Sequence, residues 1–342
     1  MSHRSIAGES WDRGRALLCR LQDTVRDALV AARATTADEV LAEVADVTAA
    51  DTIYRIDRVG EGAILAWFTE HWPRDWPIEL VMEGAEGGTA LTFPRGTPVA
   101  QTELKCILDP IDGTRNLMYD KRSAWMLSAL APQRGAATSL ADIVVAAMTE
   151  LPTTKQWASD QISGVRGCGP EGLVAERVDV RDRSRSRLPL RPSQAVDFRN
   201  GFASIARFFP EGKTLLARVE EGLWDAIYGL GSTTSPLVFD DQYMTTGGQI
   251  YELLVGHDRM LGDLRPLAHR KLGYESALAC HPYDICTSML LQEAGGVVED
   301  PWAAPLAVPL DTTSPVSWMG YANPRLAEQV RPHLRRLIAE LL

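Results

Sequence analysis

Residues 103–116 read ELKCILDPIDGTRN, and this short stretch decides how the rest of the chain is interpreted. Its first half is an apolar run that ends at Ile107 and Leu108 and predicts a buried strand. Asp109 and Asp112 follow directly, and Asp-Gly-Thr completes a turn. Ionised carboxylates are costly to bury unless a positive charge compensates them. We therefore expect a cation to be bound where this strand ends.

Three interpretations of DPIDG compete. By itself the pentapeptide is equally well explained as a plain turn, because Asp-Gly is common in hairpins and Asp-Pro often begins a loop. A calcium loop of the EF-hand type is excluded, because Ile111 occupies its third position and the glycine comes one place too early. The third interpretation is a magnesium site at a strand-to-helix corner. Pro110 favours extended backbone at Asp109, and Gly113 permits a tight turn into a helix start that attracts phosphate.

A magnesium site requires further acids from elsewhere in the chain, because two carboxylates are few for this ion. Glu83 ends the apolar run IELVME (78–83), and Asp284 comes early in HPYDICTSMLLQEAGG (281–296). Taken singly, Glu83 is as well explained by the start of a turn, and Asp284 by the preference for acids at helix starts. Taken together, acids at the ends of several elements favour one shared metal site.

Composition narrows the classes of partner. The chain has 342 residues and a formal net charge of −10, which argues against a nucleic acid polymer or an anionic membrane, because both bind basic surfaces. A phosphorylated small molecule stays compatible with this charge, because a metal ion reverses it locally. No window approaches 18 apolar residues and no secretory signal is visible, so we expect neither a membrane span nor export. The five cysteines form no CxxC pair, and free thiols in the cytoplasm are expected.

Periodicity predicts an α+β arrangement followed by α/β. Helices are expected over 15–33, 57–72, 213–229 and 281–296, and strands over 78–83, 104–109, 125–131, 143–150 and 198–208. A glycine-rich and then basic stretch from about 160 to 195 predicts a boundary between domains at 1–195 and 196–342. A last helix is expected to begin at Asn323 and Pro324, with Pro332 kinking or interrupting it.

At this point the chain resembles a known family. DPIDGT (109–114), the glutamate that closes an upstream strand (Glu83), and an aromatic-Asp pair followed by EAGG (283–296) are similar to the inositol monophosphatase family. This family belongs to a superfamily of magnesium-dependent phosphatases that includes fructose bisphosphatase. The resemblance runs from the first helix to the last. It implies a layered αβαβα sandwich, two or three Mg²⁺ ions, a small phosphorylated substrate and a homodimer.

The resemblance also implies metal and catalytic residues. The metal ligands would be Glu83, Asp109, Asp112, Asp284 and the carbonyl oxygen of Ile111. Asp57 would pair with Thr114 to orient and deprotonate the attacking water. This pair argues against a protein that only binds metal or phosphorylated ligand, because binding needs no group that activates water.

Substrate contacts follow less directly from the resemblance. The amides of Gly113 and Thr114 would hold the phosphate, and Asp284 would contact the substrate beside the metal. A turn of small residues in the second half contacts substrate hydroxyls in the family, and Gly231-Ser232-Thr233 is the expected counterpart. His281 is expected to be a helix-start neighbour and not a catalyst.

The chain departs from the family pattern at several positions. Gly84 stands where many members have a second acid, with Glu86 as a candidate replacement. Tyr283 replaces a tryptophan, and Glu275 is out of register with the acid that contacts substrate. Arg115 follows the motif, where it either reaches a second anionic group or faces solvent.

The leading hypothesis is a magnesium-dependent phosphomonoesterase for a small polyol, sugar or nucleotide phosphate. Metal ions suit this chemistry, because they neutralise the phosphate and lower the pKa of water. The alternatives are a nucleotide 3′-phosphatase or fructose bisphosphatase on the same fold, and a non-catalytic binder.

Overall fold

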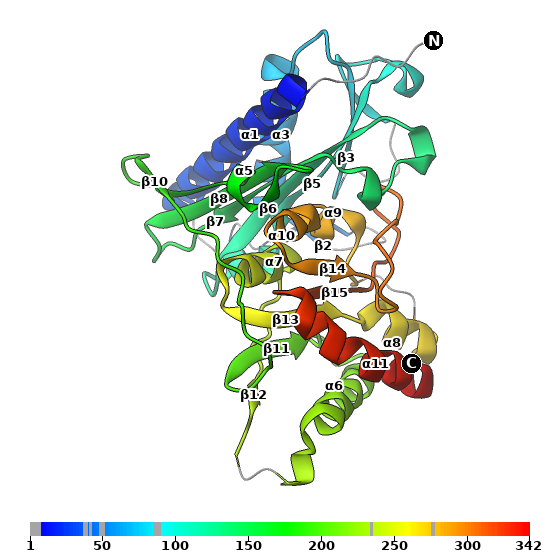
Figure 1. Ribbon diagram of the computed structural model, residues 1–342. Helices are drawn as coiled ribbons and strands as arrows, with labels where there is room; N and C mark the ends of the chain where they lie inside the picture. The colour runs from blue at the N-terminus through cyan, green and yellow to red at the C-terminus, as the bar shows by residue number, and fades with distance from the viewer. Residues whose placement is uncertain are drawn as a thin grey trace.

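The computed structural model describes residues 8–36, 40, 43–47, 52–84, 90–232, 235–274 and 278–342. Two large sheets with helices between and outside them organise this part of the chain (Figure 1). The eight-stranded sheet has the order β10-β9-β8-β7-β6-β5-β3-β4 and the five-stranded sheet the order β12-β11-β13-β15-β14. The layered αβαβα sandwich is therefore confirmed.

The strands of the larger sheet are β3 (Ile78–Met82), β4 (Leu91–Phe93), β5 (Leu104–Asp112), β6 (Ala124–Pro132), β7 (Val145–Leu151), β8 (Ala158–Val165), β9 (Val174–Asp179) and β10 (Arg185–Arg187). The smaller sheet contains β11 (Gly201–Ile205), β12 (Val238–Phe239), β13 (Asp258–Asp263), β14 (Val297–Glu299) and β15 (Trp318–Tyr321). A separate ribbon pairs β1 (Val44–Val47) with β2 (Thr52–Tyr54).

The helices form three layers (Figure 1). Against the outer face of the larger sheet lie α1 (Gly8–Thr35) and α3 (Arg55–His71). Between the sheets lie α7 (Thr246–Val255), α9 (Pro282–Ile285) and α10 (Ser288–Glu293). Outside the smaller sheet lie α6 (Lys213–Tyr228), α8 (Arg265–Leu272) and α11 (Pro324–Leu341). The single turns α4 (Thr114–Met118) and α5 (Gly169–Gly172) and the 3₁₀ turns Val99–Gln101, Gly135–Ala137, Leu140–Asp142 and Leu230–Ser232 connect these elements.

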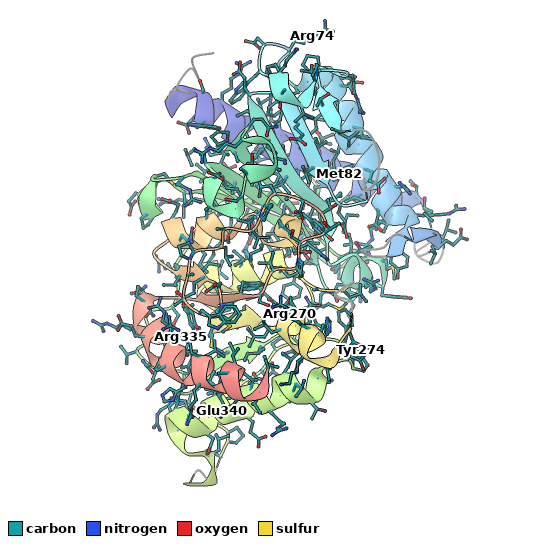
Figure 2. The ribbon with its side chains drawn as sticks, turned by 90° about the vertical axis from the view of Figure 1, so that its right-hand side faces the viewer. Arg74, Met82, Arg270, Tyr274, Arg335 and Glu340 are labelled. Atoms are coloured by element: carbon teal, nitrogen blue, oxygen red, sulfur yellow. The ribbon has the colours of Figure 1, made fainter. Side chains whose placement is uncertain are left out.

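The central strands are buried on both faces, which explains their continuous apolar sequences. Along β6, Met126 and Leu130 pack into the core beneath α1 and α3, whereas Leu127 and Ala129 pack into the core that extends to the smaller sheet. A strand covered on both faces has no polar alternation. Figure 2, turned by 90°, shows the same succession of layers from the end with Arg74 to the end with Glu340.

The last helix begins as the sequence predicts. The Asn323 side chain accepts hydrogen bonds from the amides of Arg325 and Leu326, and Pro324 occupies the first turn. Pro332 lies inside α11, which continues through it to Leu341. Of the two expected effects of Pro332, the interruption is therefore wrong, and a kink stays a prediction, because a proline within a helix removes one backbone hydrogen bond.

One other expectation is corrected. The single helix expected over 281–296 is two short helices, α9 and α10, because Thr287 leaves helical geometry (φ −93°, ψ 3°). The stretch from 160 to 195, where a domain boundary is expected, contains β8, α5, β9 and β10, and its three strands belong to the larger sheet. The expected division at residue 195 falls between β10 and β11. In the part of the chain that the structure describes, no helix is long and apolar enough to cross a bilayer.

Candidate metal-dependent active site

The DPIDGT stretch forms an irregular corner at the end of β5. The pairing of β5 with β6 shifts in register between Asp109 and Asp112, so the strand continues to Asp112 and does not end at Asp109. The amide of Ile111 donates a hydrogen bond to Asp109 Oδ1 at 2.9 Å, which fixes the carboxylate across the shift. An extra residue in one strand re-aims the side chains that follow it. The corner therefore points both aspartates to the same side.

Gly113 completes this corner with a backbone that suits only glycine. Its φ is +94°, and a Cβ at this position would lie 3.1 Å from Thr245 Cβ and 3.2 Å from the carbonyl oxygen of Met244. Side chains rarely adopt this φ. The corner thus comes close to the segment before α7.

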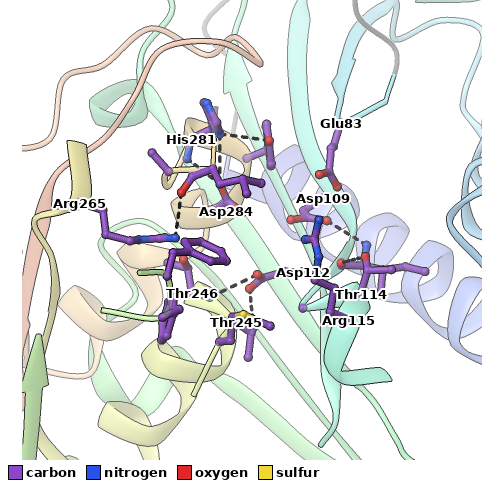
Figure 3. Close-up of a pocket in the computed structure, with 18 residues that line it drawn as sticks. Glu83, Asp109, Asp112, Thr114, Arg115, Thr245, Thr246, Arg265, His281 and Asp284 are labelled. Carbon is purple, nitrogen blue, oxygen red and sulfur yellow. Dashed lines mark hydrogen bonds and ion pairs between the residues drawn. The ribbon is translucent and has the colours of Figure 1, made fainter. Parts of the chain in front are cut away.

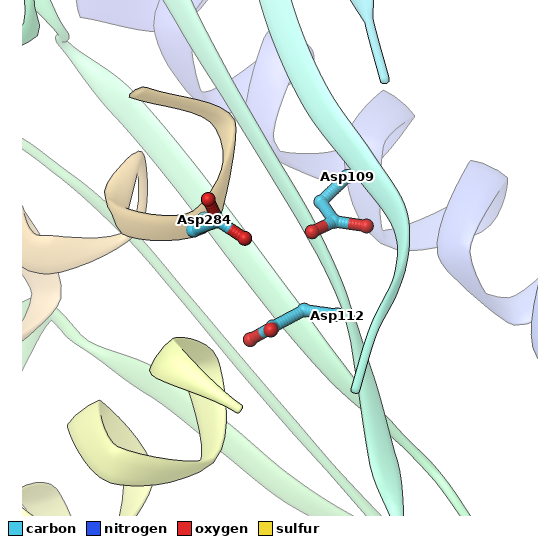
Figure 4. Close-up of side chains that lie close together, drawn as sticks. All are labelled: Asp109, Asp112 and Asp284. Atoms are coloured by element: carbon cyan, nitrogen blue, oxygen red, sulfur yellow. The ribbon is translucent and has the colours of Figure 1, made fainter. Parts of the chain in front are cut away.

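Three acids meet at the corner. Asp109, Asp112 and Asp284 each offer one carboxylate oxygen, and these oxygens all lie within 4.8 Å of one another (Figure 4). Glu83 lines the same cavity from the turn directly after β3, next to Asp109 (Figure 3). The four acids expected to form a metal site thus face one cavity, although they come from β5, α9 and the turn after β3.

The N-terminus of α7 holds Asp112 in place. The hydroxyl of Thr245 donates to Asp112 Oδ2 at 2.6 Å, and the amide of Gly247 donates to the same oxygen at 2.5 Å. The amide of Thr246 donates to Asp112 Oδ1 at 3.3 Å. The first amides of a helix lack acceptors within it and carry partial positive charge. This helix start therefore stabilises the ionised form of Asp112.

Asp284 is oriented by its own short helix. It is the third residue of α9, and its Oδ2 accepts a hydrogen bond from the amide of His281 at 2.6 Å. His281 precedes the helix, and its Nδ1 lies 3.2 Å from the Tyr283 hydroxyl. His281 thus lies at the helix start, as expected from the sequence.

Burial and like charge shift the protonation of this cluster. Burial, followed by Glu83, Asp112 and Asp284, raises the pKa of Asp109 well above its usual range. Burial raises the pKa of Asp112 to about 6 against the opposing hydrogen bonds from Thr245 and the α7 amides. Burial and Asp112 raise the pKa of Asp284 well above its usual range. Buried carboxylates that repel one another are stabilised as anions by a bound cation.

Asp57 and Thr114 form the expected pair beside the cluster. The Thr114 hydroxyl donates to Asp57 Oδ1 at 3.0 Å and lies 2.9 Å from the carbonyl oxygen of Ile111. Asp57 Oδ2 accepts the amide of Tyr54 at 2.7 Å, which anchors the carboxylate to the start of α3. Thr114 lines the cavity. The pair therefore joins α3 to the corner after β5.

The donor set fits magnesium. The acids that line the cavity supply hard carboxylate oxygens, and Ile111 lines the cavity beside them. Lysine does not occur among the described residues that line the cavity. Magnesium prefers oxygen ligands and a few carboxylates. Glu83, Asp109, Asp112, Asp284 and Ile111 are the residues that would hold it.

The structure does not bring Gly231 to this cavity. Gly231 lies in the 3₁₀ turn Leu230–Ser232 after α6 and is not among the residues that line the cavity at β5 and α9. It lines a separate cavity with Arg218, Asp225 and Leu337. For Gly231 the expected approach to the cavity is not seen, because Met244, Thr245 and Thr246 at the start of α7 line it instead. A contact of Ser232 with the substrate stays a prediction. The side chain of Ser232, and Thr233, Glu86 and Glu275, lie outside what the structure describes.

Several residues of the cavity wall were not expected from the sequence. Thr245 and Thr246 come from the start of α7, Arg265 from the start of α8, and Phe208 and Phe209 from the segment after β11. Arg115, whose role the sequence left open, also lines the cavity, with its guanidinium 5.6 Å from the Tyr54 ring centre. The small residues of TTGG (245–248) could have indicated from the sequence that the start of α7 packs closely against another segment, because glycine permits close backbone approach.

Comparisons with known proteins establish the fold. No model of a protein family matches the chain, and no curated protein sequence matches it. Solved structures do match over nearly the whole length. Fructose-1,6-bisphosphatase from Leishmania major has a TM-score of 0.63 at 13% identity, covering 96% of this chain and 96% of that chain. The extragenic suppressor protein SuhB from Bartonella henselae has a TM-score of 0.61 at 16% identity, covering 96% of this chain and 100% of that chain.

An inositol monophosphatase from Anabaena (Nostoc) is also similar, with a TM-score of 0.59 at 13% identity, covering 98% of each chain. At sequence identities this low, similarity to a solved structure indicates the fold and not the substrate. The chain therefore has the fold of the inositol monophosphatase and fructose bisphosphatase superfamily, as its DPIDGT motif predicts.

Proposed function

We propose that the chain is a magnesium-dependent phosphomonoesterase that hydrolyses a small phosphorylated polyol, sugar or nucleotide. The observation that carries this proposal is the convergence of Asp109, Asp112 and Asp284 within 4.8 Å. Glu83 on the cavity wall and the adjacent Asp57–Thr114 pair support it. The names of the similar structures, which include inositol monophosphatase and fructose-1,6-bisphosphatase, agree with this class of reaction.

Each residue has a defined task in the proposed reaction. Bound Mg²⁺ would neutralise the phosphate and make water a better nucleophile. Thr114 Oγ1 accepts a hydrogen bond from the attacking water while its own proton points to Asp57 Oδ1. As the water oxygen attacks phosphorus, the bond from phosphorus to the ester oxygen breaks. One water proton passes to Thr114 Oγ1, the hydroxyl proton passes to Asp57, and solvent water gives a proton to the leaving alkoxide. The amides of Gly113 and Thr114 begin α4, where the first N–H groups have no acceptor in the helix, and they hold the phosphate.

Phosphate release from a panel of substrates tests the proposal. The panel contains inositol 1-phosphate, fructose 1,6-bisphosphate and 3′-phosphoadenosine 5′-phosphate, each with Mg²⁺ or with a chelator. We expect release from at least one compound with Mg²⁺ only, and its loss in Asp109→Asn. Asp75→Asn is the control, because Asp75 is an exposed acid in the turn after α3. Unchanged turnover in Asp109→Asn would contradict the proposal.

The same panel decides between the alternatives. Preference for the nucleotide or the bisphosphate would identify a nucleotide 3′-phosphatase or a fructose bisphosphatase. Magnesium binding by calorimetry, with no phosphate released from any compound, would identify a non-catalytic binder. The homodimer, the cytoplasmic location and the number of magnesium ions, two or three, stay predictions, as do the two domains.

A further inference from the structure

Arg265 is a buried cation on the wall of a cavity lined by acids. Its residue is 7% exposed, yet it lines the same cavity as Asp112, Asp284 and Thr114. Figure 3 shows Arg265 on the side of the cavity away from Thr114 and Arg115, with Asp112 and Asp284 between them. Its position follows from the chain path, because β13 ends at Asp263 and α8 begins at Arg265.

Asp263 fixes one edge of the Arg265 guanidinium. Nε lies 3.0 Å from each Asp263 oxygen, and Nη2 lies 2.6 Å from Asp263 Oδ2. Asp263 also accepts the backbone amide of Arg265 at 2.9 Å, and it is 1% exposed. Because Asp263 does not line the cavity, it acts on the cavity only through Arg265. It is a positioning residue.

Two N–H groups of Arg265 are left over. A guanidinium has five N–H groups. Asp263 takes one on Nε and one on Nη2, and the carbonyl oxygen of Leu278 takes one on Nη1 at 3.0 Å. Among the described residues no acceptor is present for the remaining N–H on each terminal nitrogen. Buried charged donors of this kind are costly unless an acceptor reaches them.

Two aromatic rings lie beside the guanidinium group of Arg265. Arg265 Cζ lies 5.0 Å from the ring centre of Phe208 and 5.4 Å from that of Phe209. Both rings are half-buried and line the cavity. Arginine stacked on aromatic faces and fixed by a carboxylate loses little freedom when it binds a ligand. The unused N–H groups are therefore preorganised donors.

We propose that Arg265 binds a second oxyanion on the substrate, a phosphate or a carboxylate, at the opposite end of the cavity from Thr114. This inference rests on the proposed function and names its substrate class, a phosphomonoester with a further anionic group. Two N–H groups on one guanidinium match the paired oxygens of such a group. Asp263 already balances the charge of Arg265, so the contribution is hydrogen bonding and orientation more than net attraction.

A purely structural role for Arg265 makes a different prediction. In that case the ion pair would only connect β13 to the segment at Leu278, and its loss would lower kcat/KM equally for all substrates. In the proposed role, its loss lowers kcat/KM only for substrates that carry the second anion. Matched substrate pairs separate the two roles.

The experiment uses two substrate pairs and the full chain with Mg²⁺. Glycerol 2-phosphate and 2-phosphoglycerate differ by a carboxylate, and fructose 1-phosphate and fructose 1,6-bisphosphate differ by a phosphate. The double variant Asp263→Asn/Arg265→Gln removes both charges, because removing one alone would leave the other buried without a partner. Arg265→Lys keeps the charge without the planar fork. Arg115→Met is the matched control, because it removes the other arginine of the cavity wall.

We expect the double variant to lower kcat/KM roughly tenfold to a hundredfold for the doubly anionic member of at least one pair, which corresponds to the loss of charge-assisted hydrogen bonds. Its partner should change little, Arg265→Lys should fall between, and Arg115→Met should affect both members equally. An effect in the first pair identifies the second anionic group as a carboxylate. An effect in the second pair identifies it as a phosphate. Equal losses within both pairs, or a preference removed by Arg115→Met and not by the Arg265 variants, would overturn the inference.

Calorimetry separates this inference from the proposed function. If no compound is hydrolysed, the proposed function fails, and binding of the same four compounds is then compared. Tighter binding of a doubly anionic member that is lost in the double variant would still support the Arg265 site. Equal binding within both pairs would overturn it. Circular dichroism and thermal unfolding establish that each variant is folded.

Discussion

The hydroxyl of Thr114 donates a hydrogen bond to Asp57 Oδ1 at 3.0 Å, across 57 residues of sequence. The two residues sit at the starts of two helices, α4 and α3. Asp57 is 9% exposed and also caps α3 through the amide of Tyr54. Because a hydroxyl carries one proton, donation to Asp57 directs the Thr114 oxygen lone pairs elsewhere. This arrangement supports the proposed role of the pair in orienting a water molecule.

Thr114→Val removes this oxygen and keeps the shape of the side chain. We expect kcat to fall by about 10²–10⁴-fold, the usual contribution of a positioned acid–base group, with magnesium affinity unchanged. Thr114→Ser keeps the hydroxyl and should stay within about tenfold of the unchanged protein on the same argument. Steady-state kinetics and magnesium titration calorimetry measure the two quantities. Loss of magnesium binding in Thr114→Val with unchanged kcat would contradict the assigned role.

Gly247→Ala tests the support that α7 gives to Asp112. A Cβ at Gly247 would lie 2.5 Å from Leu127 Cδ2 and 3.0 Å from Asp112 Oδ2, so the helix start and the carboxylate must move apart. We expect a stability loss of about 1–3 kcal/mol, as for overpacking, and weaker magnesium binding.

Gly62→Ala is the control for this change. Gly62 lies on α3 with nothing within 4 Å of an added Cβ. Alanine favours helices over glycine by about 1 kcal/mol, so this variant should be slightly more stable and bind magnesium normally. Urea unfolding and calorimetry measure both variants. Normal magnesium affinity in a folded Gly247→Ala protein would show that the close approach does not position Asp112.

The site illustrates what a sequence can and cannot predict. Asp109 and Asp112 were predictable because the corner is local, with a proline and a glycine that constrain the backbone around them. Glu83 and Asp284 were predictable because each follows a local signal at the end of an element. These residues follow one another along the chain in the order found in the family that the sequence resembles, and this match assigned Glu83 and Asp284 to the same site.

The rest of the cavity wall was less predictable, because it depends on packing between segments that are distant in the sequence. Gly231-Ser232 and the TTGG segment are both small-residue clusters, and the sequence gives no sign of which one packs against Asp112. Arg265 carries no motif, and its environment arises from Asp263, Phe208 and Phe209 only after folding. Similarly, the extension of β5 to Asp112 follows from its pairing with β6.

The environment of Asp258 predicts that the stability depends on pH. Burial, followed by Glu252 and Asp241, raises the pKa of this carboxyl to about 7, against the opposing effects of His257 and Arg122. An unfolded aspartate has a pKa of about 3.9, so the folded state binds the proton more tightly. The associated stability is present below about pH 4 and is lost as pH rises through about 7.

Asp258→Asn removes this titration. We expect the variant to be more stable than the unchanged protein at pH 8 by roughly 1–3 kcal/mol, and to lose that advantage at pH 4.5. Urea unfolding of both proteins at the two pH values gives the comparison, in which the titration of all other groups cancels. A difference between the proteins that does not change with pH would contradict the raised pKa.

The central claim is that Asp109, Asp112 and Asp284 hold a divalent cation together. Anomalous diffraction from crystals grown with Mn²⁺, a substitute for Mg²⁺ that favours the same oxygen ligands, tests it most directly. We predict an anomalous peak among the carboxylates of these three residues, close to Glu83, and no such peak in Asp109→Asn crystals. Well-ordered crystals of the unchanged protein in millimolar Mn²⁺ that show no peak in this cavity would contradict the account.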